Sequence, residues 1–461
     1  MNFLTELFDY QQRAVDKMIK VKVGALYMEQ GTGKTRTALE IIKIRLEKEK
    51  IDNVLWFCPC SVKSNLKKDI IKHTGSDQAN IIRIAGIESM SSSERLFNEL
   101  KQYVTERTFI IVDESILVKN FFSIRTRRIT ELCSIAKYKI LMNGTPISVN
   151  EGDLFAQWYM LDWRILGYKS YYSFAANHYE YDKHNGRITK CLNADNLVKK
   201  ISPYTYEIKK KDCLELPDKH YYFNYYTMPD FQLNEYYEAY VHFMGEIDEF
   251  ESTTVYRFFT ALQDVVAGLK VREEKKKIVT SKLFDDPHKN PRIAKLLEIL
   301  DDEKTIIFAK YAHEIDDIVQ VLEAKYGKGC AVKFCGDISL KQRQNSLQEF
   351  ENNDKVKYFI ANQRCGAYGL NLQFCNHMIF YSFDFNMAIR LQAEDRIHRI
   401  GQDKDVLIEM IVAEDTIDEF ICNNLDKKEN LISYLMQEIK KNNGMIKETL
   451  EQMISQKAHL E

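Results

Sequence analysis

The sequence predicts an α/β protein with two parallel-sheet lobes, and three observations support this prediction. Short apolar runs alternate with helical patterns in residues 1–150, and the same alternation returns in residues 291–425. A glycine-rich turn at residues 31–35 joins an apolar run to a helical pattern. Alternating strands and helices form parallel sheets with right-handed crossovers. With 461 residues and 45% hydrophobic content, the chain is long enough for about two or three domains and a large core.

Composition argues against several classes of protein. The sequence has no apolar run of about eighteen residues and no leader pattern in residues 1–9, so we expect a soluble, non-secreted protein of the cytoplasm, in a bacterium or a virus-infected cell, with no membrane partner. The ten cysteines include no CxxC pair, which favours reduced thiols over zinc sites or disulfides. With a net charge of −2, nucleic-acid contact would depend on local basic strips such as residues 209–211 and 275–277, although short charge runs are usually solvated faces.

The first strand and helix predict a phosphate-binding loop between them. Residues 24–28 have the pattern of a buried strand, and a helical pattern follows the loop. Glycines let the backbone N–H groups surround phosphate oxygens at a helix N-terminus. Lys34 would neutralise the phosphates of ATP, and the Thr35 hydroxyl would ligate Mg²⁺. Met28 stands where the full pattern has another glycine, so a chance Gly-Lys turn is the alternative. The loop residues assigned to the nucleotide are Gly31, Thr32, Gly33, Lys34 and Thr35.

A buried strand that ends in two carboxylates is the second predicted part of the site. Residues 109–112 are apolar and run directly into Asp113 and Glu114. Such strand ends face the ligand crevice of a parallel sheet. Asp113 is assigned to Mg²⁺, and Glu114 is assigned to orienting or deprotonating the attacking water. The alternative is that these carboxylates only cap the turn between a strand and a helix. The phosphate loop in the same lobe favours the catalytic interpretation over this alternative.

Other element ends are candidates for contacts with a base or a DNA backbone. Gln11 is assigned to the adenine edge, with a surface glutamine at a helix start as the alternative. Two later strands end at Pro59-Cys-Ser61 and at Asn143-Gly-Thr-Pro146. Their residues Pro59, Ser61 and Thr145 are assigned to a phosphodiester backbone held through amides and hydroxyls. In isolation, these fragments are ordinary turns.

Residues 392–402, Gln-Ala-Glu-Asp-Arg-Ile-His-Arg-Ile-Gly-Gln, predict a helix with one polar face and one apolar face. Gln392, Arg396 and Arg399 stand at i, i+4 and i+7, so they would project from one side. Planar guanidinium groups suit polyphosphate charge, so both arginines are assigned to catalysis and Gln392 to the nucleotide. The neighbouring apolar stripe consists of Ile389, Ala393, Ile397 and Ile400.

In this order, the segments resemble those of superfamily-two helicases, and residues 392–402 resemble the QAEDRxHRIGQ segment of the Swi/Snf-type (SNF2-like) DNA translocases. Residues 366–372 resemble the GGxGxNL segment of that branch, and residues 416–419 resemble its TIEE segment. The resemblance implies two RecA-like lobes that hold ATP and Mg²⁺ between them and DNA across the top. We assign Gly369 of the segment at residues 366–372 to the nucleotide site, and we expect the monomer to be active.

Several positions depart from the family pattern. The phosphate loop carries Met28-Glu-Gln before its glycines, where family members usually have Asp-Glu-Met. Ile116 stands where a histidine usually couples hydrolysis to nucleic acid, so coupling here needs another contact. Leu66 replaces a usual tryptophan, and Lys310 replaces a usual glutamine. Hydrolysis should survive because both carboxylates after residue 112 remain.

The expected organisation has four parts. Residues 1–150 form the first RecA-like lobe, residues 151–290 a helical protrusion and linker with few strands, residues 291–425 the second lobe, and residues 426–461 a C-terminal helical brace. Most tyrosines of the linker should pack helices rather than stack on bases. In the second lobe, Gly336, Ser339 and Arg343 resemble the family's DGxxxxxxR element and are assigned to a phosphate of the tracked DNA strand. An exposed helix N-cap at Ser339 is the alternative.

Three functions are consistent with these residues. The first is an ATP-dependent translocase that moves duplex or branched DNA, as in branch migration or fork remodelling during replication, recombination or repair. The compact chain favours it, because no chromatin-reading or nuclease module is evident. The second is an ATP-driven remover of proteins from DNA. The third is a nucleotide-switched DNA-binding scaffold with little hydrolysis, for which Ile116 is the only hint. An RNA helicase is a weaker alternative, since that branch normally shows a different arginine segment.

Overall fold

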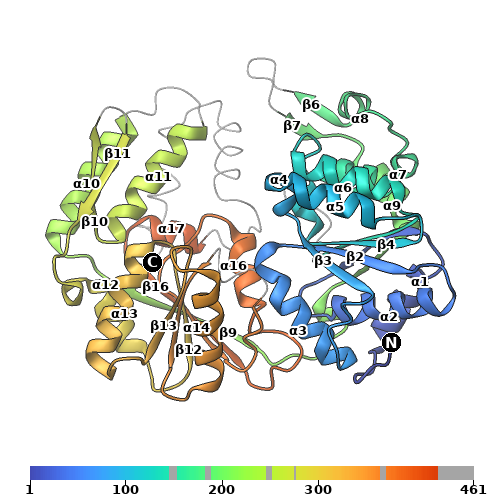
Figure 1. Ribbon diagram of the computed structural model, residues 1–461. Helices are drawn as coiled ribbons and strands as arrows, with labels where there is room; N and C mark the ends of the chain where they lie inside the picture. The colour runs from blue at the N-terminus through green and yellow to red at the C-terminus, as the bar shows by residue number, and fades with distance from the viewer. Residues whose placement is uncertain (145–152, 182–187, 246–251, 275–276, 364–369, 424–461) are drawn as a thin grey trace. The chain divides into compact units, whose positions relative to one another are not determined.

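The computed structural model describes residues 1–144, 153–181, 188–245, 252–274, 277–363 and 370–423 (Figure 1). The chain forms two compact units, residues 1–215 and residues 216–461, and each contains its own six-stranded sheet. Every neighbouring pair of strands in both sheets is parallel. The prediction of an α/β protein with two RecA-like parallel-sheet lobes is therefore confirmed. None of the helices in the described ranges is both long and apolar enough to span a bilayer.

The sheet of the first unit has the strand order β3-β2-β4-β5-β1-β8. Its strands are β1 (Val23–Met28), β2 (Asn53–Cys58), β3 (Ile82–Gly86), β4 (Thr108–Asp113), β5 (Tyr138–Asn143) and β8 (Thr205–Ile208). Its helices are α1 (Asp9–Met18), α2 (Lys34–Glu47), α3 (Lys63–Thr74), α4 (Ser89–Ser92), α5 (Glu94–Tyr103), α6 (Ile124–Ile135), α7 (Leu154–Leu166), α8 (Tyr171–His178) and α9 (Ala194–Ile201). A small antiparallel hairpin joins β6 (Tyr179–Tyr181) and β7 (Ile188–Cys191).

Both faces of this sheet are buried, which is why its strands are nearly continuous apolar runs. Successive side chains of a strand point to opposite faces. On β1, Ala25 and Tyr27 enter a core that includes residues of α6 and α7, while Leu26 and Met28 enter a second core with α1 and α2. The two cores fix the sheet on both sides and leave its strand ends for function.

The sheet of the second unit has the order β13-β14-β12-β15-β16-β9. Its strands are β9 (Lys219–Tyr226), β12 (Thr305–Ala309), β13 (Ala331–Phe334), β14 (Tyr358–Asn362), β15 (His377–Phe380) and β16 (Val406–Ala413). Its helices are α10 (Asp230–Gly245), α11 (Ser252–Val266), α12 (Pro291–Ile299), α13 (Ala312–Tyr326), α14 (Leu340–Asn352), α16 (Met387–Glu394) and α17 (Ile417–Asn423), and an antiparallel hairpin joins β10 (Leu269–Glu274) and β11 (Lys277–Lys282). One continuous core includes buried residues of the other strands, and Ile278 of β11 packs against it.

Residues 151–290 differ from the expected helical segment. The described part of this segment contains β6 to β11, and two of these strands, β8 and β9, complete the edges of the two main sheets. The expectation of few strands was wrong because β8 contains threonine, tyrosine and isoleucine and β9 is rich in tyrosine, residues that suit a pleated surface. The boundary between the units falls after residue 215 rather than at residues 150 and 290. The expected C-terminal brace, residues 426–461, lies outside the described residues.

Candidate functional site

The phosphate loop connects β1 to α2 with two glycines in the left-handed region of backbone space. Gly31 and Gly33 both have a φ of 83°, a conformation that L side chains rarely adopt. Gly33 is the N-cap of α2, and a Cβ atom there would collide with the side-chain amide of Gln11. The loop therefore has the geometry that exposes backbone N–H groups at a helix N-terminus, where anions bind.

Two residues of α1 hold the loop in place. Gln11 is buried, its Nε2 donates to the Thr32 carbonyl at 3.0 Å, and its Oε1 accepts from the Phe8 backbone N–H at 3.1 Å. The Tyr10 hydroxyl donates to the same Thr32 carbonyl at 3.0 Å. Gln11 is thus not the surface glutamine of the alternative interpretation, and its assignment to the adenine edge stays a prediction. Sequence reasoning missed Tyr10, which only the folded loop brings to Thr32.

Lys34 and Thr35 form the first turn of α2. The Lys34 ammonium donates to the Met28 carbonyl at 2.8 Å, which folds its side chain back over the loop. Thr35 is half-buried in the same turn. Both side chains therefore start from the helix terminus that the loop encloses, as the sequence predicted.

The two carboxylates stand at the end of β4, beside β5. Burial and the neighbouring Glu114 charge together raise the pKa of the Asp113 carboxyl to about 7, against the Lys34 ammonium, which acts to lower it. The Glu114 backbone N–H also donates to Asp113 Oδ1 at 3.0 Å. Lys34 and Asp113 thus act on each other electrostatically at one edge of the sheet. A desolvated carboxyl with a raised pKa beside a second acid suits a divalent cation.

Glu114 has a strained backbone. Its φ of 50° and ψ of 52° lie in the left-handed region, which costs a residue other than glycine about 1–3 kcal/mol. Such strain persists where surrounding contacts impose it, and it is concentrated at functional sites. Gln30, at the start of the loop, donates to the Glu114 carboxylate. Sequence reasoning did not assign Gln30, although it is one of the departures from the family pattern.

The other predicted strand ends lie on the same sheet edge, because β2, β4, β5 and β1 are consecutive and parallel. Pro59 is buried at the end of β2, and Ser61 is exposed in the short turn that follows. Asn143 ends β5, and its Oδ1 accepts from the Gly144 N–H at 3.0 Å. Thr145 lies outside the described residues. The assignment of Pro59 and Ser61 to a DNA backbone stays a prediction.

In the second unit, the predicted helix through residues 392–402 is wrong after its first turn. α16 ends at Glu394, and Arg396 N–H bonds to the Ala393 carbonyl at 3.0 Å, an i+3 contact that tightens the chain. Gln392 therefore does not share one helix face with both arginines. The reason is tertiary: Gln402 Nε2 donates to the carbonyls of Gln373 at 3.1 Å and Cys375 at 3.0 Å, which draws the segment away from the helix axis.

Three of the four predicted apolar positions, Ile389, Ala393 and Ile397, are buried, and Ile400 is half-buried. Arg396 is buried, and half-buried Arg399 donates through Nη1 to Asn371 Oδ1. Asn371 belongs to the Gly-Leu-Asn-Leu segment, and Gly369, at its start, lies outside the described residues.

The predicted phosphate element of the second unit is a helix start. Ser339 is exposed and caps α14 by accepting from the Gln342 N–H at 3.3 Å, as the alternative interpretation expected. Arg343 Nη2 donates to the carbonyl of exposed Gly336 at 2.9 Å. The structure brings these three assigned residues together, and their contact with DNA stays a prediction.

Comparison with known proteins identifies the family. The model of the helicase conserved C-terminal domain matches residues 288–401, and the model of the type III restriction enzyme res subunit matches residues 4–147. A SWI/SNF-related subfamily A-like protein 1 homologue of Caenorhabditis elegans is 25% identical over 93% of this chain and 61% of its own length. The mouse chromodomain-helicase-DNA-binding protein 1-like is 23% identical over 89% of this chain and 47% of its own length. The chain is an SNF2-like ATPase of helicase superfamily two.

This SNF2-like ATPase spans about half the length of the curated relatives it matches. An uncharacterized ATP-dependent helicase of Mycoplasma genitalium is 26% identical over 74% of this chain and 32% of its own length. Among solved structures, the Sulfolobus solfataricus SWI2/SNF2 ATPase core in complex with dsDNA is similar to this chain, with 22% identity, a TM-score of 0.43, and coverage of 98% of this chain and 97% of that one.

The residues of this SNF2-like ATPase fit ATP and Mg²⁺. Glycines in the left-handed region, an ammonium and a helix N-terminus suit the phosphates. The Thr35 hydroxyl and the Asp113 carboxylate are oxygen donors of the kind that Mg²⁺ prefers. When bound, the cation would lower the pKa of Asp113, which burial and the Glu114 charge raise.

Proposed function

We propose that this SNF2-like ATPase couples ATP hydrolysis to translocation along duplex or branched DNA. The observation that carries the proposal is the convergence of the phosphate loop, Lys34, Asp113 and strained Glu114 at one edge of the first sheet. Family membership supports the choice of ATP as nucleotide and DNA as partner. The names of two relatives, a DNA repair protein of fission yeast and a DNA-binding helicase of mouse, support the latter.

Each residue of the first unit has a separate task in this proposal. Lys34 and the loop amides bind and neutralise the phosphates, and Asp113 with Thr35 would hold Mg²⁺, which supplies charge neutralisation for the leaving group. Glu114 orients the attacking water and accepts its proton. Arg396 and Arg399 of the second unit supply positive charge to the transferred phosphoryl group, so turnover requires the two lobes to close on ATP.

Closure and reopening of the lobes would move the protein along a DNA strand. Pro59, Ser61 and Thr145 of the first lobe and Gly336, Ser339 and Arg343 of the second are the proposed backbone contacts. Contacts to phosphates position a protein on DNA without reading its sequence. We therefore propose that the substrate is defined by DNA structure, with four-way junctions and forks as the preferred class and the monomer as the active form.

ATPase rates with different nucleic acids test this proposal. The rate should be measured without nucleic acid and with single-stranded DNA, duplex DNA, a four-way junction and RNA, at a stated salt concentration because phosphate contacts are salt-dependent. Lys34→Ala serves as the inactive control. Stimulation by duplex DNA, and more strongly by the junction, supports a remodelling translocase. Hydrolysis that no nucleic acid stimulates would overturn the motor assignment.

A displacement assay then separates the two translocase functions. A labelled third strand on a duplex reports translocation, a labelled junction arm reports branch migration, and a protein bound to duplex reports protein removal. We expect the protein to displace the third strand and to move the junction arm, with similar rates of ATP hydrolysis on the two substrates. Efficient protein removal without branch migration would favour an ATP-driven remover of proteins from DNA.

A further inference from the structure

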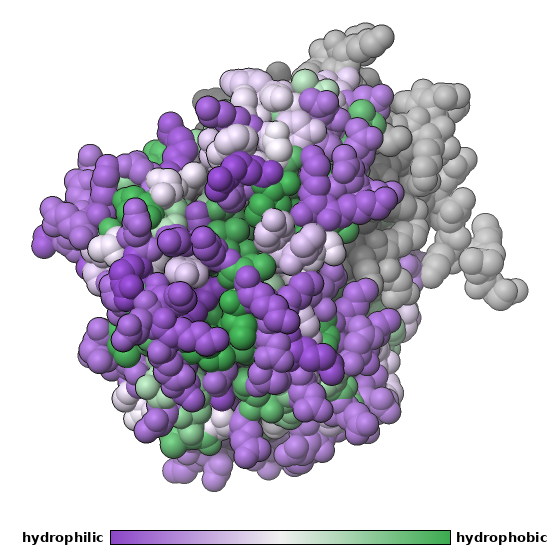
Figure 2. Space-filling model, turned by 90° about the vertical axis from the view of Figure 1, so that its right-hand side faces the viewer, coloured by the Kyte–Doolittle hydropathy of each residue, from purple (hydrophilic) through white to green (hydrophobic). Residues whose placement is uncertain are grey.

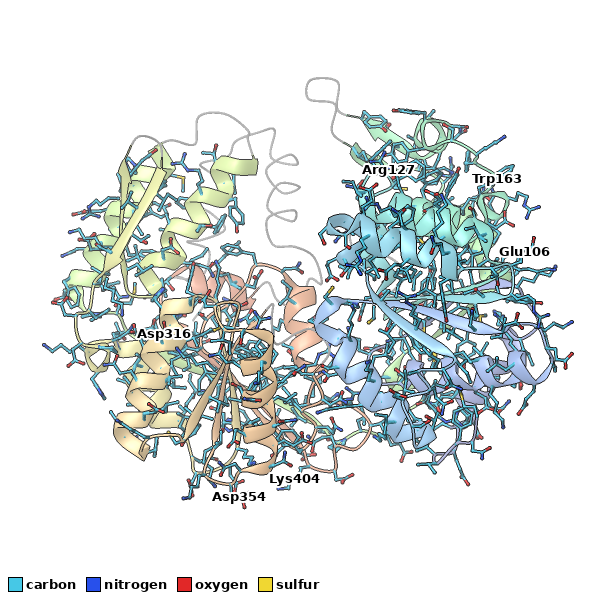
Figure 3. All side chains as sticks on the ribbon, viewed as in Figure 1. Glu106, Arg127, Trp163, Asp316, Asp354 and Lys404 are labelled. Carbon is cyan, nitrogen blue, oxygen red and sulfur yellow. The ribbon has the colours of Figure 1, made fainter. Side chains whose placement is uncertain are left out.

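A cavity of about 1030 Å³ lies in the first unit, at the amino edge of its sheet. Residues that line it precede or begin the four consecutive strands β4, β5, β1 and β8, and others come from α6 and α7. Figure 3 labels three of the lining residues, Glu106, Arg127 and Trp163. Lys34 and Asp113 stand at the opposite, carboxyl edge of the same strands, so this cavity is separate from the nucleotide site.

Five cations of the cavity form no ion pair with any carboxylate of the described part of the chain. They are Lys20, Lys22, Arg127, Lys137 and Lys139. Backbone contacts bring some of them together: Lys139 N–H bonds to the Lys22 carbonyl at 3.0 Å, because β1 and β5 are adjacent. Lys139 is also half-buried, and this burial lowers the pKa of its ammonium. Several unpaired positive charges at one edge repel one another, which favours an anionic occupant.

The acids of the cavity leave most of this charge uncompensated. Asp162 is occupied by Arg164, with its Oδ1 accepting from Nε at 2.9 Å and its Oδ2 from Nη2 at 2.6 Å. Glu131 is paired with Lys101 at 2.5 Å. Glu106 is the remaining carboxylate of the cavity. The cavity therefore carries a net positive charge.

Apolar side chains form the rest of the lining. Val23, Ile135, Ala136, Met160 and Leu161 contribute aliphatic surface, and Tyr159, Trp163 and Tyr204 contribute rings. The helix α7 is interrupted at Asp162, whose φ of −167° and ψ of 112° are extended, and Trp163 just after it is 38% exposed. Figure 2 shows one side of the molecule, on which hydrophobic residues form a strip between hydrophilic residues.

The two halves of the lining select one class of occupant. Inorganic phosphate or a DNA backbone would use the cations and leave the apolar surface uncovered, whereas a neutral apolar ligand would leave the charges unpaired. We propose that this cavity is a docking site for an acidic segment of a partner protein that also carries apolar side chains. Carboxylates of the segment meet the lysines, and its apolar side chains cover the surface between α6 and α7. The proposal does not depend on ATP hydrolysis.

Tryptophan fluorescence of the full chain tests the proposal. The chain contains three tryptophans, of which Trp56 and Trp158 are fully buried, so Trp163 is the one that a ligand of the cavity can touch. The probe is a twelve-residue peptide of repeated Asp-Leu-Glu-Leu, titrated to about 1 mM. We expect a saturable change in the emission of Trp163. Salt should weaken the binding of the peptide, and Trp163→Phe should abolish the change in emission. The double variant Lys137→Ala with Arg127→Ala should bind about tenfold more weakly.

Matched controls decide the outcome. Lys50→Ala, an exposed lysine elsewhere on the same unit, should leave the titration unchanged, and far-ultraviolet circular dichroism should show that all variants are folded. The same peptide with Asn and Gln in place of its acids should bind at least tenfold more weakly. Equal binding of the neutral peptide, no response to the acidic peptide, or tighter binding of tripolyphosphate or duplex DNA through the same residues would each overturn the proposal.

Discussion

Gln30 Nε2 donates a hydrogen bond to Glu114 Oε1 at 3.4 Å, across 84 residues of sequence. Gly144 lies against the same side chain, since a Cβ atom added at Gly144 would stand 3.3 Å from Gln30 Cγ. The phosphate loop, the acidic end of β4 and the end of β5 thus meet at the Gln30 side chain. The family usually has methionine at this position of the loop, which cannot donate a hydrogen bond.

Replacing Gln30 by methionine tests whether this contact positions Glu114. One hydrogen bond contributes about 0.5–1.5 kcal/mol, so Gln30→Met should lower kcat by roughly two- to tenfold with KM for ATP nearly unchanged. Steady-state ATPase kinetics measure both parameters. Gln12→Met, an exposed glutamine of α1 paired with Asp16, is the matched control and should change neither. A rise in KM at constant kcat would assign Gln30 to nucleotide binding.

Arg399→Ala should retain nucleotide binding and lose turnover. Arginines that stabilise a transferred phosphoryl group contribute around 10³–10⁵ in rate. Binding is measured by titration with a fluorescent ATP analogue and turnover by phosphate release. Arg95→Ala, at an exposed arginine of α5, should keep full turnover. Near-normal ATPase activity of Arg399→Ala would defeat the requirement for lobe closure.

Asp113 gives the nucleotide-free protein a specific pH dependence. Burial and Glu114 raise the pKa of this carboxyl from 3.8 to about 7, so the folded state holds its proton at pH values where the unfolded chain has released it. The contribution of Asp113 to the free energy of unfolding is therefore greatest below pH 3.8, and it decreases as the pH rises toward 7. Asp113→Asn removes that loss, and its Tm advantage over the parent should grow between about pH 4 and pH 7 and then level off.

Thermal unfolding across this pH range, without nucleotide or Mg²⁺, measures the effect. Asp354→Asn, at an exposed loop position, is the control and should show no such growth. Adding Mg²⁺ and ATP at pH 8 should raise the Tm of the parent more than that of Asp113→Asn, because only the parent offers the carboxylate of residue 113 to the cation. A constant Tm difference at all pH values would contradict the assignment.

Asp418 of the Thr-Ile-Asp-Glu segment holds the second unit together. Its carboxylate pairs with Arg292 of α12, and both side chains are almost completely buried. The Arg292 guanidinium also lies over the rings of Tyr226 and Tyr381, 5.5 Å from each centroid. Asp418→Ala should destabilise the unit by about 3–5 kcal/mol, because it leaves a buried charge without this partner.

Urea denaturation followed by tyrosine fluorescence and circular dichroism checks this value. Asp302→Ala serves as the control, since the Asp302 side chain is 94% exposed and its contact with Lys357 is long, at 3.9 Å. The pair Arg292→Met with Asp418→Leu should recover much of the loss, because an apolar pair leaves no buried charge. A loss below about 1 kcal/mol for Asp418→Ala would show that the segment acts in another way.

The sequence alone determined the parts of the site that depend on local order. A strand, two glycines, Lys34 and a helix follow one another without interruption, and so do a buried strand, Asp113 and Glu114. Hydrophobic periodicity and chain direction place such segments at one edge of a parallel sheet, whatever the rest of the chain does. The same local logic gave the buried stripe around Ala393.

Only the tertiary structure decided what depends on contacts between distant residues. Helical spacing predicted one face for Gln392, Arg396 and Arg399, but the side chain of Gln402 bonds to the carbonyls of Gln373 and Cys375, and the helix ends at Glu394. The run at β8 and the tyrosine-rich run at β9 became sheet edges because partner strands were available there. The hydrogen bond from Gln30 to Glu114 also joins segments that are distant in the sequence. The same is true of the lysines at the amino edge of the first sheet, which lie together only in the folded chain. The order and spacing of residues determine the direction of each strand or helix and which of its faces is apolar. The free energy of packing determines which residues that are distant in the sequence come into contact.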